Sequence, residues 1–231
     1  MSSLQVRIGL ERGVQGRSLA WALDFPGAFA YGKDDAEALL ALPRALIQFE
    51  SWVGLHSDAS WVRLPEFGLK VTESFETYIA DEDYEVNAFF KDDRKPPTAL
   101  EIARALDIHR WQREELLAGV ETLSPELVTR MLPGQRWNIN GILNHIGRVE
   151  YWYLSNTNLA LPSADSLVHN PFRLLETTYS LVNKLLPELE GEASVIEQGP
   201  ETWSARKLLR RLLWHQRDHI EHIKELAGIP L

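Results

Sequence analysis

The sequence predicts an α+β protein, with a small sheet domain over residues 1–97 followed by an all-α four-helix bundle over residues 98–231. Two observations predict this division. The apolar residues alternate in much of the first part and recur at intervals of three and four in the second, and these periods are typical of strands and helices respectively. Residues 92–97 are charged and end in two prolines, a composition that is typical of a linker.

Four extended segments are expected in the first domain. Residues 17–31, RSLAWALDFPGAFAY, alternate on either side of a Pro26-Gly27 pair, which predicts two short strands joined by a turn. Residues 69–79 and 83–91 also alternate and are rich in β-branched and aromatic side chains, so they predict two further strands.

One helix is expected in the same domain. Asp34 and Glu37 have the spacing of a capping box. The apolar residues that follow recur at helical intervals: Leu39, Leu42, Leu46, Phe49 and Val53. The first domain is therefore predicted to be a small sheet with one helix.

The second domain is predicted to contain four long helices and a short one. Side chains that commonly cap helix N-termini mark the starts of four of them: Thr98, Ser124, Asn138 and Ser204. The remaining long helix is indicated by helical spacing: Phe172, Leu175, Tyr179, Val182 and Leu186. We recognise no strand pattern between these helices, which favours a four-helix bundle.

Histidines occupy the apolar stripes of two of these helices. The stripe of the helix that starts at Asn138 is Ile142, His145, Val149 and Trp152. The stripe of the last helix is Leu208, Leu212, His215, His219, His222 and Leu226. His215 and His219 are one turn apart and project from the same face, and His145 has an equivalent inward phase. Three such imidazoles suit a metal ion with one open coordination position.

A core role is the alternative for these histidines. A single histidine on an apolar stripe is more often hydrogen-bonded to a carbonyl or a carboxylate. Several on two helices favour a shared metal, because each buried imidazole without a partner costs about 1–3 kcal/mol.

Two further residues are assigned to the surroundings of the proposed site. His222 is expected to support the site or to replace a ligand. Glu150 is expected to orient a ligand, and an exposed carboxylate is the alternative. The other histidines, at positions 56, 109 and 169, are expected to be solvated.

Composition and motifs exclude several classes of protein. The chain contains no cysteine, which excludes disulfides, thiolate metal sites and a cysteine nucleophile. The HxxxH segment reads HQRDH and lacks the glutamate that serves as general base in zinc proteases. The excess of 33 acidic over 24 basic residues disfavours nucleic-acid binding. With no stretch of about 20 apolar residues and no signal-peptide pattern, we expect a cytoplasmic protein without a membrane partner.

Two stretches of the second domain resemble the DinB-like family of metal-binding four-helix bundles. They are LSPE through PGQRWNINGILNH, ending at His145, and WS through LWHQRDHI, which contains His215 and His219. The resemblance covers residues 98–231 and implies that these three histidines bind zinc, nickel or iron, with water completing the shell. Several branches are similar to mycothiol- or bacillithiol-dependent transferases and maleylpyruvate isomerases. The family also implies a homodimer and, for some members, a role in stress responses.

Residues 18–53 are similar to HicB-like antitoxin domains. The similarity rests on the FPG turn at residues 25–27 and the helix start at Asp34. HicB antitoxins commonly add a DNA-binding domain, which we do not recognise in this sequence. We therefore expect a packing, dimerisation or pocket-covering role for the first domain.

The leading functional hypothesis is a metal-dependent enzyme that acts on a small molecule. Its metal would activate water or a low-molecular-weight thiol, and the thiol would be a cosubstrate because the chain has no cysteine. The expected reaction is thiol transfer or hydrolysis, with substrate facing Trp152, Trp214 or residues 156–170.

Two alternatives do not require catalysis. In the first, the protein is a binding module whose acidic first domain, with 16 acidic and 10 basic side chains, captures a protein partner. In the second, it is a stress sensor whose metal site controls dimer packing.

Overall fold

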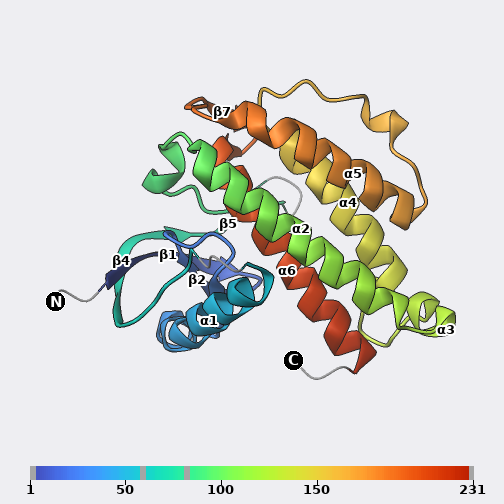
Figure 1. Cartoon of the computed structure of the whole chain (residues 1–231), viewed down its shortest axis with the longest axis horizontal. Coiled ribbons are helices and arrows are strands. Elements are labelled where there is room, and N and C mark those ends of the chain that lie inside the picture. The colour runs from blue at the N-terminus through green and yellow to red at the C-terminus, as the bar shows by residue number, and fades with distance from the viewer. Residues whose placement is uncertain (1–3, 58–60, 81–83, 229–231) are drawn as a thin grey trace. The chain divides into compact units, whose positions relative to one another are not determined.

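A computed structural model describes residues 4–57, 61–80 and 84–228 and confirms the α+β class (Figure 1). The chain divides into two compact units. The first comprises Met1–Lys95 and Ala193–Arg210, and the second comprises Pro96–Glu192 and Arg211–Leu231. The division after Lys95 lies next to the predicted boundary, whereas residues 193–210 cluster with the first unit instead of the second.

The first unit contains a four-stranded sheet in the order β3-β2-β1-β4. The strands are β1 (Leu4–Val14), β2 (Arg17–Ala22), β3 (Phe29–Gly32) and β4 (Phe67–Glu76). Strand β1 pairs antiparallel with β2 and parallel with β4. It is not among the strands expected from the sequence, although Leu4, Val6, Ile8 and Leu10 alternate along it. Glu11 belongs to the other set of alternating positions. That carboxylate is fully buried and accepts hydrogen bonds from Trp21 Nε1 at 2.8 Å and Ala88 N at 2.6 Å.

Helix α1 (Asp35–His56) packs against β2 and β3. Asp34 caps it by accepting a hydrogen bond from Glu37 N at 2.9 Å, as predicted. The buried face is Ala38, Leu42, Leu46, Phe49 and Val53. The predicted stripe is therefore confirmed except at its first position, where Ala38 takes the place of Leu39.

Two short hairpins complete the strands of the first unit. Strands β5 (Tyr78–Ala80) and β6 (Tyr84–Val86) pair with each other, as do β7 (Val195–Gln198) and β8 (Glu201–Ser204). The predicted strand 83–91 is thus shortened to β6, and Asp83 lies outside the described residues. The hairpin β7–β8 corrects the expectation that no strand interrupts the helices of the second domain.

Buried ion pairs explain how charged segments become part of the first unit. Asp93, in the predicted linker, is buried and accepts a hydrogen bond from Arg210 Nη2 at 2.7 Å. Lys207 and Glu201 are also buried, and Nζ of Lys207 lies 2.7 Å from Oε1 of Glu201. Asp93 and Arg210 are far apart in the sequence, and neither pair adds to an apolar period, so the sequence pattern does not reveal them.

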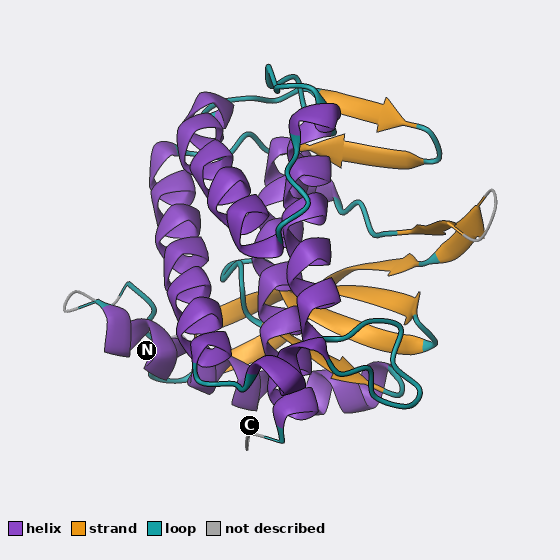
Figure 2. Ribbon diagram, turned by 90° about the vertical axis from the view of Figure 1, so that its right-hand side faces the viewer, coloured by secondary structure: helices purple, strands orange, loops and turns teal. Residues whose placement is uncertain are grey.

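The second unit is helical (Figure 2). Its helices are α2 (Ala99–Glu121), α3 (Pro125–Thr129), α4 (Ile139–Ser155), α5 (Pro171–Leu185) and the greater part of α6 (Ala205–Ala227). The second unit also contains the 3-10 helices η3 (Ala164–Ser166) and η4 (Leu186–Leu189), whereas η2 (Lys91–Arg94) belongs to the first unit. The predicted caps Thr98, Ser124, Asn138 and Ser204 each accept a backbone hydrogen bond at the start of their helix.

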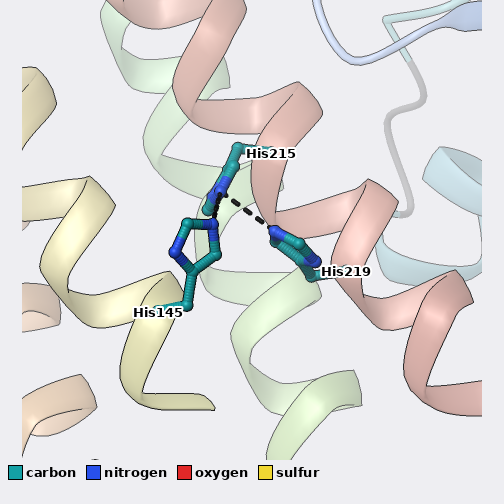
Figure 3. A group of neighbouring side chains, drawn as sticks. All are labelled: His145, His215 and His219. Carbon is teal, nitrogen blue, oxygen red and sulfur yellow. Dashed lines mark hydrogen bonds between the residues drawn. The ribbon is translucent and has the colours of Figure 1, made fainter. Parts of the chain in front are cut away.

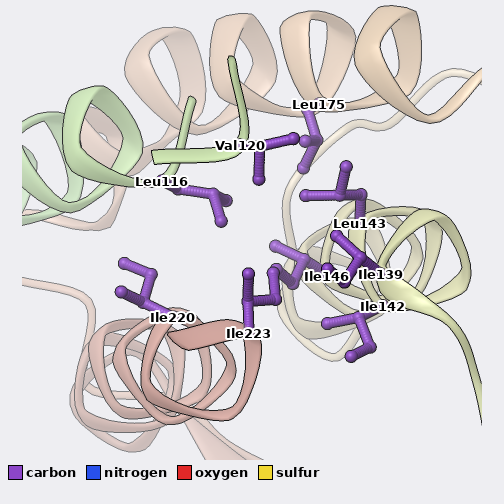
Figure 4. Packing of buried hydrophobic residues seen from close by; sticks show 9 residues of the cluster. All are labelled: Leu116, Val120, Ile139, Ile142, Leu143, Ile146, Leu175, Ile220 and Ile223. Atoms are coloured by element: carbon purple, nitrogen blue, oxygen red, sulfur yellow. The ribbon is translucent and has the colours of Figure 1, made fainter. Parts of the chain in front are cut away.

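Four helices of this unit share one apolar core (Figure 4). Its buried members come from α2, α4, α5 and α6: Leu116, Val120, Ile139, Ile142, Leu143, Ile146, Leu175, Ile220 and Ile223. The buried face of α4 differs from the predicted stripe, because Trp152 is 37% exposed. No helix in the described part of the chain is long and apolar enough to cross a bilayer.

Candidate metal centre

Three histidines from two helices meet in the second unit (Figure 3). His145 lies on α4, and His215 and His219 lie one turn apart on α6. Nε2 of His215 is 3.1 Å from Nε2 of His145 and 3.0 Å from Nε2 of His219. The ring nitrogens that could serve as ligands all lie within 4.8 Å of one another. We call these residues the three-histidine group.

The spacing of these nitrogens fits a single cation. Imidazole nitrogens bind zinc at about 2.0–2.1 Å, so two ligand nitrogens at angles between 90° and 110° lie about 2.8–3.4 Å apart. Both Nε2–Nε2 distances, 3.0 and 3.1 Å, fall in this range. Direct hydrogen bonds between the imidazoles account for the arrangement less well. Each Nε2 carries either a proton or a lone pair, whereas the single Nε2 of His215 faces the Nε2 atoms of both His145 and His219. A shared cation accepts all three lone pairs together.

The histidines are neutral at pH 7. Burial, together with the nearby charge of Arg136, lowers the pKa of His145 to about 4. Burial also lowers the pKa of His219 to about 3, and neighbouring histidines add to the effect. The pKa of His215 is lowered well below its ordinary value, again chiefly by burial. Neutral imidazole is the form that binds metals, so no proton has to leave before a cation binds.

Aromatic rings hold the group in place. The Trp137 ring stacks on His145 with centroids 4.5 Å apart and an interplanar angle of 27°. The Tyr153 ring meets His215 edge-on at 5.8 Å. Nδ1 of His215 and of His219 has no hydrogen-bond partner among the described residues. His215 is buried, whereas His145 and His219 are partly exposed, which leaves one side of the group nearer to solvent.

The two residues expected to support the site do not contact its nitrogens directly. Nε2 of His222 pairs with Gln135 Oε1 at 2.9 Å, and the His222 ring centroid is 6.2 Å from that of His219. Glu150 is 2% exposed, so the exposed alternative is wrong. In the described part of the chain, the Glu150 carboxylate accepts hydrogen bonds from His109, Arg113 and Thr178 and not from the three-histidine group.

The expectation that His109 is solvated is wrong. The side chain is fully buried on α2, its Nε2 lies 3.0 Å from Glu150 Oε1, and its ring stacks on Tyr179. His109 is four residues after the buried Ala105, so helical spacing places it on the same face. Arg113, four residues further on, is charged, and the apolar pattern of this face therefore ends there. His56 and His169 are exposed, as expected.

Sequence reasoning also missed a buried polar network around Glu150. Arg113 pairs with Glu150 and donates from Nε to Gln216 Oε1 at 2.8 Å. Gln216 in turn donates to the carbonyl of His109 at 3.0 Å. Thr178 Oγ1 donates to Glu150 Oε2 at 2.6 Å. We call Glu150, His109, Arg113, Thr178 and Gln216 the Glu150 network. It includes Gln216, the neighbour of His215 in sequence.

No family model, no curated protein and no solved structure matches the chain in comparisons with known proteins.

Proposed function

We propose that the second unit is a DinB-like four-helix bundle that holds one divalent metal ion, zinc, nickel or iron, through Nε2 of His145, His215 and His219. The observation that carries this proposal is the convergence of three neutral imidazoles from two helices, at 3.0 and 3.1 Å. The core shared by α2, α4, α5 and α6 supports the bundle architecture. The sheet and α1 support the similarity of the first unit to a HicB-like domain.

The function we propose is that of a metal-dependent enzyme. When bound, the metal lowers the pKa of a coordinated water or thiol, which suits hydrolysis or thiol transfer. The chain supplies three neutral ligands and no thiol of its own, because it contains no cysteine. Trp137 and Tyr153 pack against the imidazoles. The partial exposure of His145 and His219 leaves a side by which a small substrate can approach.

Metal analysis of the purified full-length protein tests the proposal. After incubation with zinc, nickel or iron and dialysis, we expect about one equivalent of metal to remain on the unaltered protein. His145→Ala, His215→Ala and His219→Ala each remove a ligand, and we expect metal affinity to fall by more than about 100-fold. Circular dichroism shows whether each variant remains folded.

His222→Ala is the matched control. It removes an imidazole from the same helix, one that pairs with Gln135, and we expect it to retain the metal. Failure of the unaltered protein to hold any of the three metals would contradict the proposal. Equal metal content in a variant that lacks all three histidines would contradict it as well.

A further inference from the structure

Arg136 lies at the end of a stack of flat groups that leads to the proposed metal centre. Its guanidinium carbon is 4.5 Å from the centroid of the Trp137 ring. The same indole stacks on the imidazole of His145 at 4.5 Å. Arg136 directly precedes Trp137 in the segment that leads into α4, and its side chain is exposed. The stack therefore places a positive charge one indole ring away from His145, the ligand that α4 contributes.

The hydrogen-bonding edge of Arg136 is available to a ligand. Stacking engages the face of a guanidinium and leaves its in-plane N–H groups free to bind a carboxylate in bidentate fashion. Among the described residues, Arg136 forms neither a hydrogen bond nor an ion pair. Three other arginines of the same unit do have acidic partners: Arg110 pairs with Asp107 and Glu114, Arg113 with Glu150, and Arg217 with Glu115 and Glu221.

A second arginine adds to the positive charge around the group. The guanidinium of Arg211, which is buried on α6, lies 4.0 Å from the centroid of the Trp214 ring. That indole is 6.0 Å from the ring of His215. A divalent cation held by three neutral imidazoles adds two further positive charges, and the three-histidine group itself contains no carboxylate. A positive charge in a partly buried site attracts ligands of the opposite sign.

We infer that the proposed metal centre takes a small molecule with two anionic groups, one of which approaches the metal while the other, a carboxylate, pairs with the guanidinium of Arg136. This inference rests on the proposed metal site and names the class of ligand. It assigns to Arg136 the role of selecting dianions over monoanions and neutral ligands.

Ligand binding to the nickel-loaded full-length protein tests this inference. Succinate, acetate and the neutral ligand imidazole are titrated by calorimetry, and the ligand-field absorption of nickel reports whether each probe reaches the metal. We expect succinate to bind the unaltered protein at least about tenfold more tightly than acetate, because a second charge-assisted, bidentate contact is formed. In Arg136→Gln this preference is expected to disappear, whereas the affinities for acetate and imidazole change less than about twofold.

Arg148→Gln is the matched control, since Arg148 is an exposed arginine on α4 that donates to Asn144. We expect this variant to behave like the unaltered protein. Equal preference for succinate over acetate in the Arg136→Gln and unaltered proteins would overturn the inference. Nickel content is measured on the same samples. A chain that holds no nickel contradicts the metal site for this ion, whereas a loaded chain without dependence on Arg136 overturns only the choice of ligand.

Discussion

Replacement of Glu150 by leucine is expected to lower the free energy of unfolding by about 3–5 kcal/mol. Glu150 is the acceptor of the Glu150 network and takes hydrogen bonds from Arg113, His109 and Thr178. Arg113 and His109 are 4% and 0% exposed. Without the carboxylate, the guanidinium keeps its charge in a buried place with no anion beside it, and that is the costly outcome for a buried pair.

Urea denaturation followed by circular dichroism measures this effect. Glu114→Leu is the matched control, because Glu114 pairs with Arg110 on the surface of α2 and exposed pairs contribute about 0–1 kcal/mol. The double variant Glu150→Leu with Arg113→Met removes both charges and is expected to recover much of the lost stability. A loss below about 1 kcal/mol for Glu150→Leu alone would contradict the importance assigned to this network.

The metal-free protein is expected to lose stability as the pH falls from about 6.5 toward 4. Burial holds the pKa of His145 at about 4 and that of His219 at about 3. Burial also lowers the pKa values of His215 and His109. In the unfolded chain these imidazoles titrate near about 6.5. At pH values between the folded-state and unfolded-state pKa values, the unfolded state binds more protons than the folded state. The free energy of unfolding therefore rises with pH and falls on acidification.

Urea denaturation at a series of pH values in the presence of a chelator measures the dependence. At pH 5.5 we expect unfolding to take up more than one proton, which corresponds to a slope above about 1.4 kcal/mol per pH unit. Glu150 contributes in a separate window. Burial raises its pKa, but Arg113 and His109 outweigh this effect and lower the pKa to about 2, so its contribution is lost only below about pH 4.5.

His219→Leu provides the comparison for this pH dependence. Removal of one of the depressed imidazoles is expected to reduce the slope between pH 6.5 and 5. A stability that stays constant over this range in the metal-free protein would show that the imidazoles are not buried in neutral form.

Features with a local signature could be predicted from the sequence. The N-caps Thr98 and Asn138 are short-range patterns, and the structure confirms both. His215 and His219 are four residues apart, so their common face follows from helix geometry alone. The phase of its helix predicts that His145 faces inward, and His145 does meet the other two histidines, although Trp152 on the same predicted stripe is exposed.

Features that depend on contacts between distant residues could not be predicted in the same way. Glu11 lies in β1, one of the two inner strands of the sheet, where its burial depends on Trp21 and Ala88. From the sequence alone, Arg113 and Glu150 are expected to be polar surface residues. Their burial follows from the packing of the helices and is not visible in either segment by itself. The apolar period of a segment reports which face is buried when that face is hydrophobic, and it gives no signal where buried charges satisfy one another.

X-ray absorption spectroscopy of the metal-loaded full-length protein tests most directly whether three imidazoles from α4 and α6 share one cation. We predict a nearest shell that contains three imidazole nitrogens at about 2.0–2.1 Å and loses one of them in His145→Ala and in His215→Ala. A shell made only of oxygen ligands, or a spectrum that is unchanged in both variants, would contradict the account.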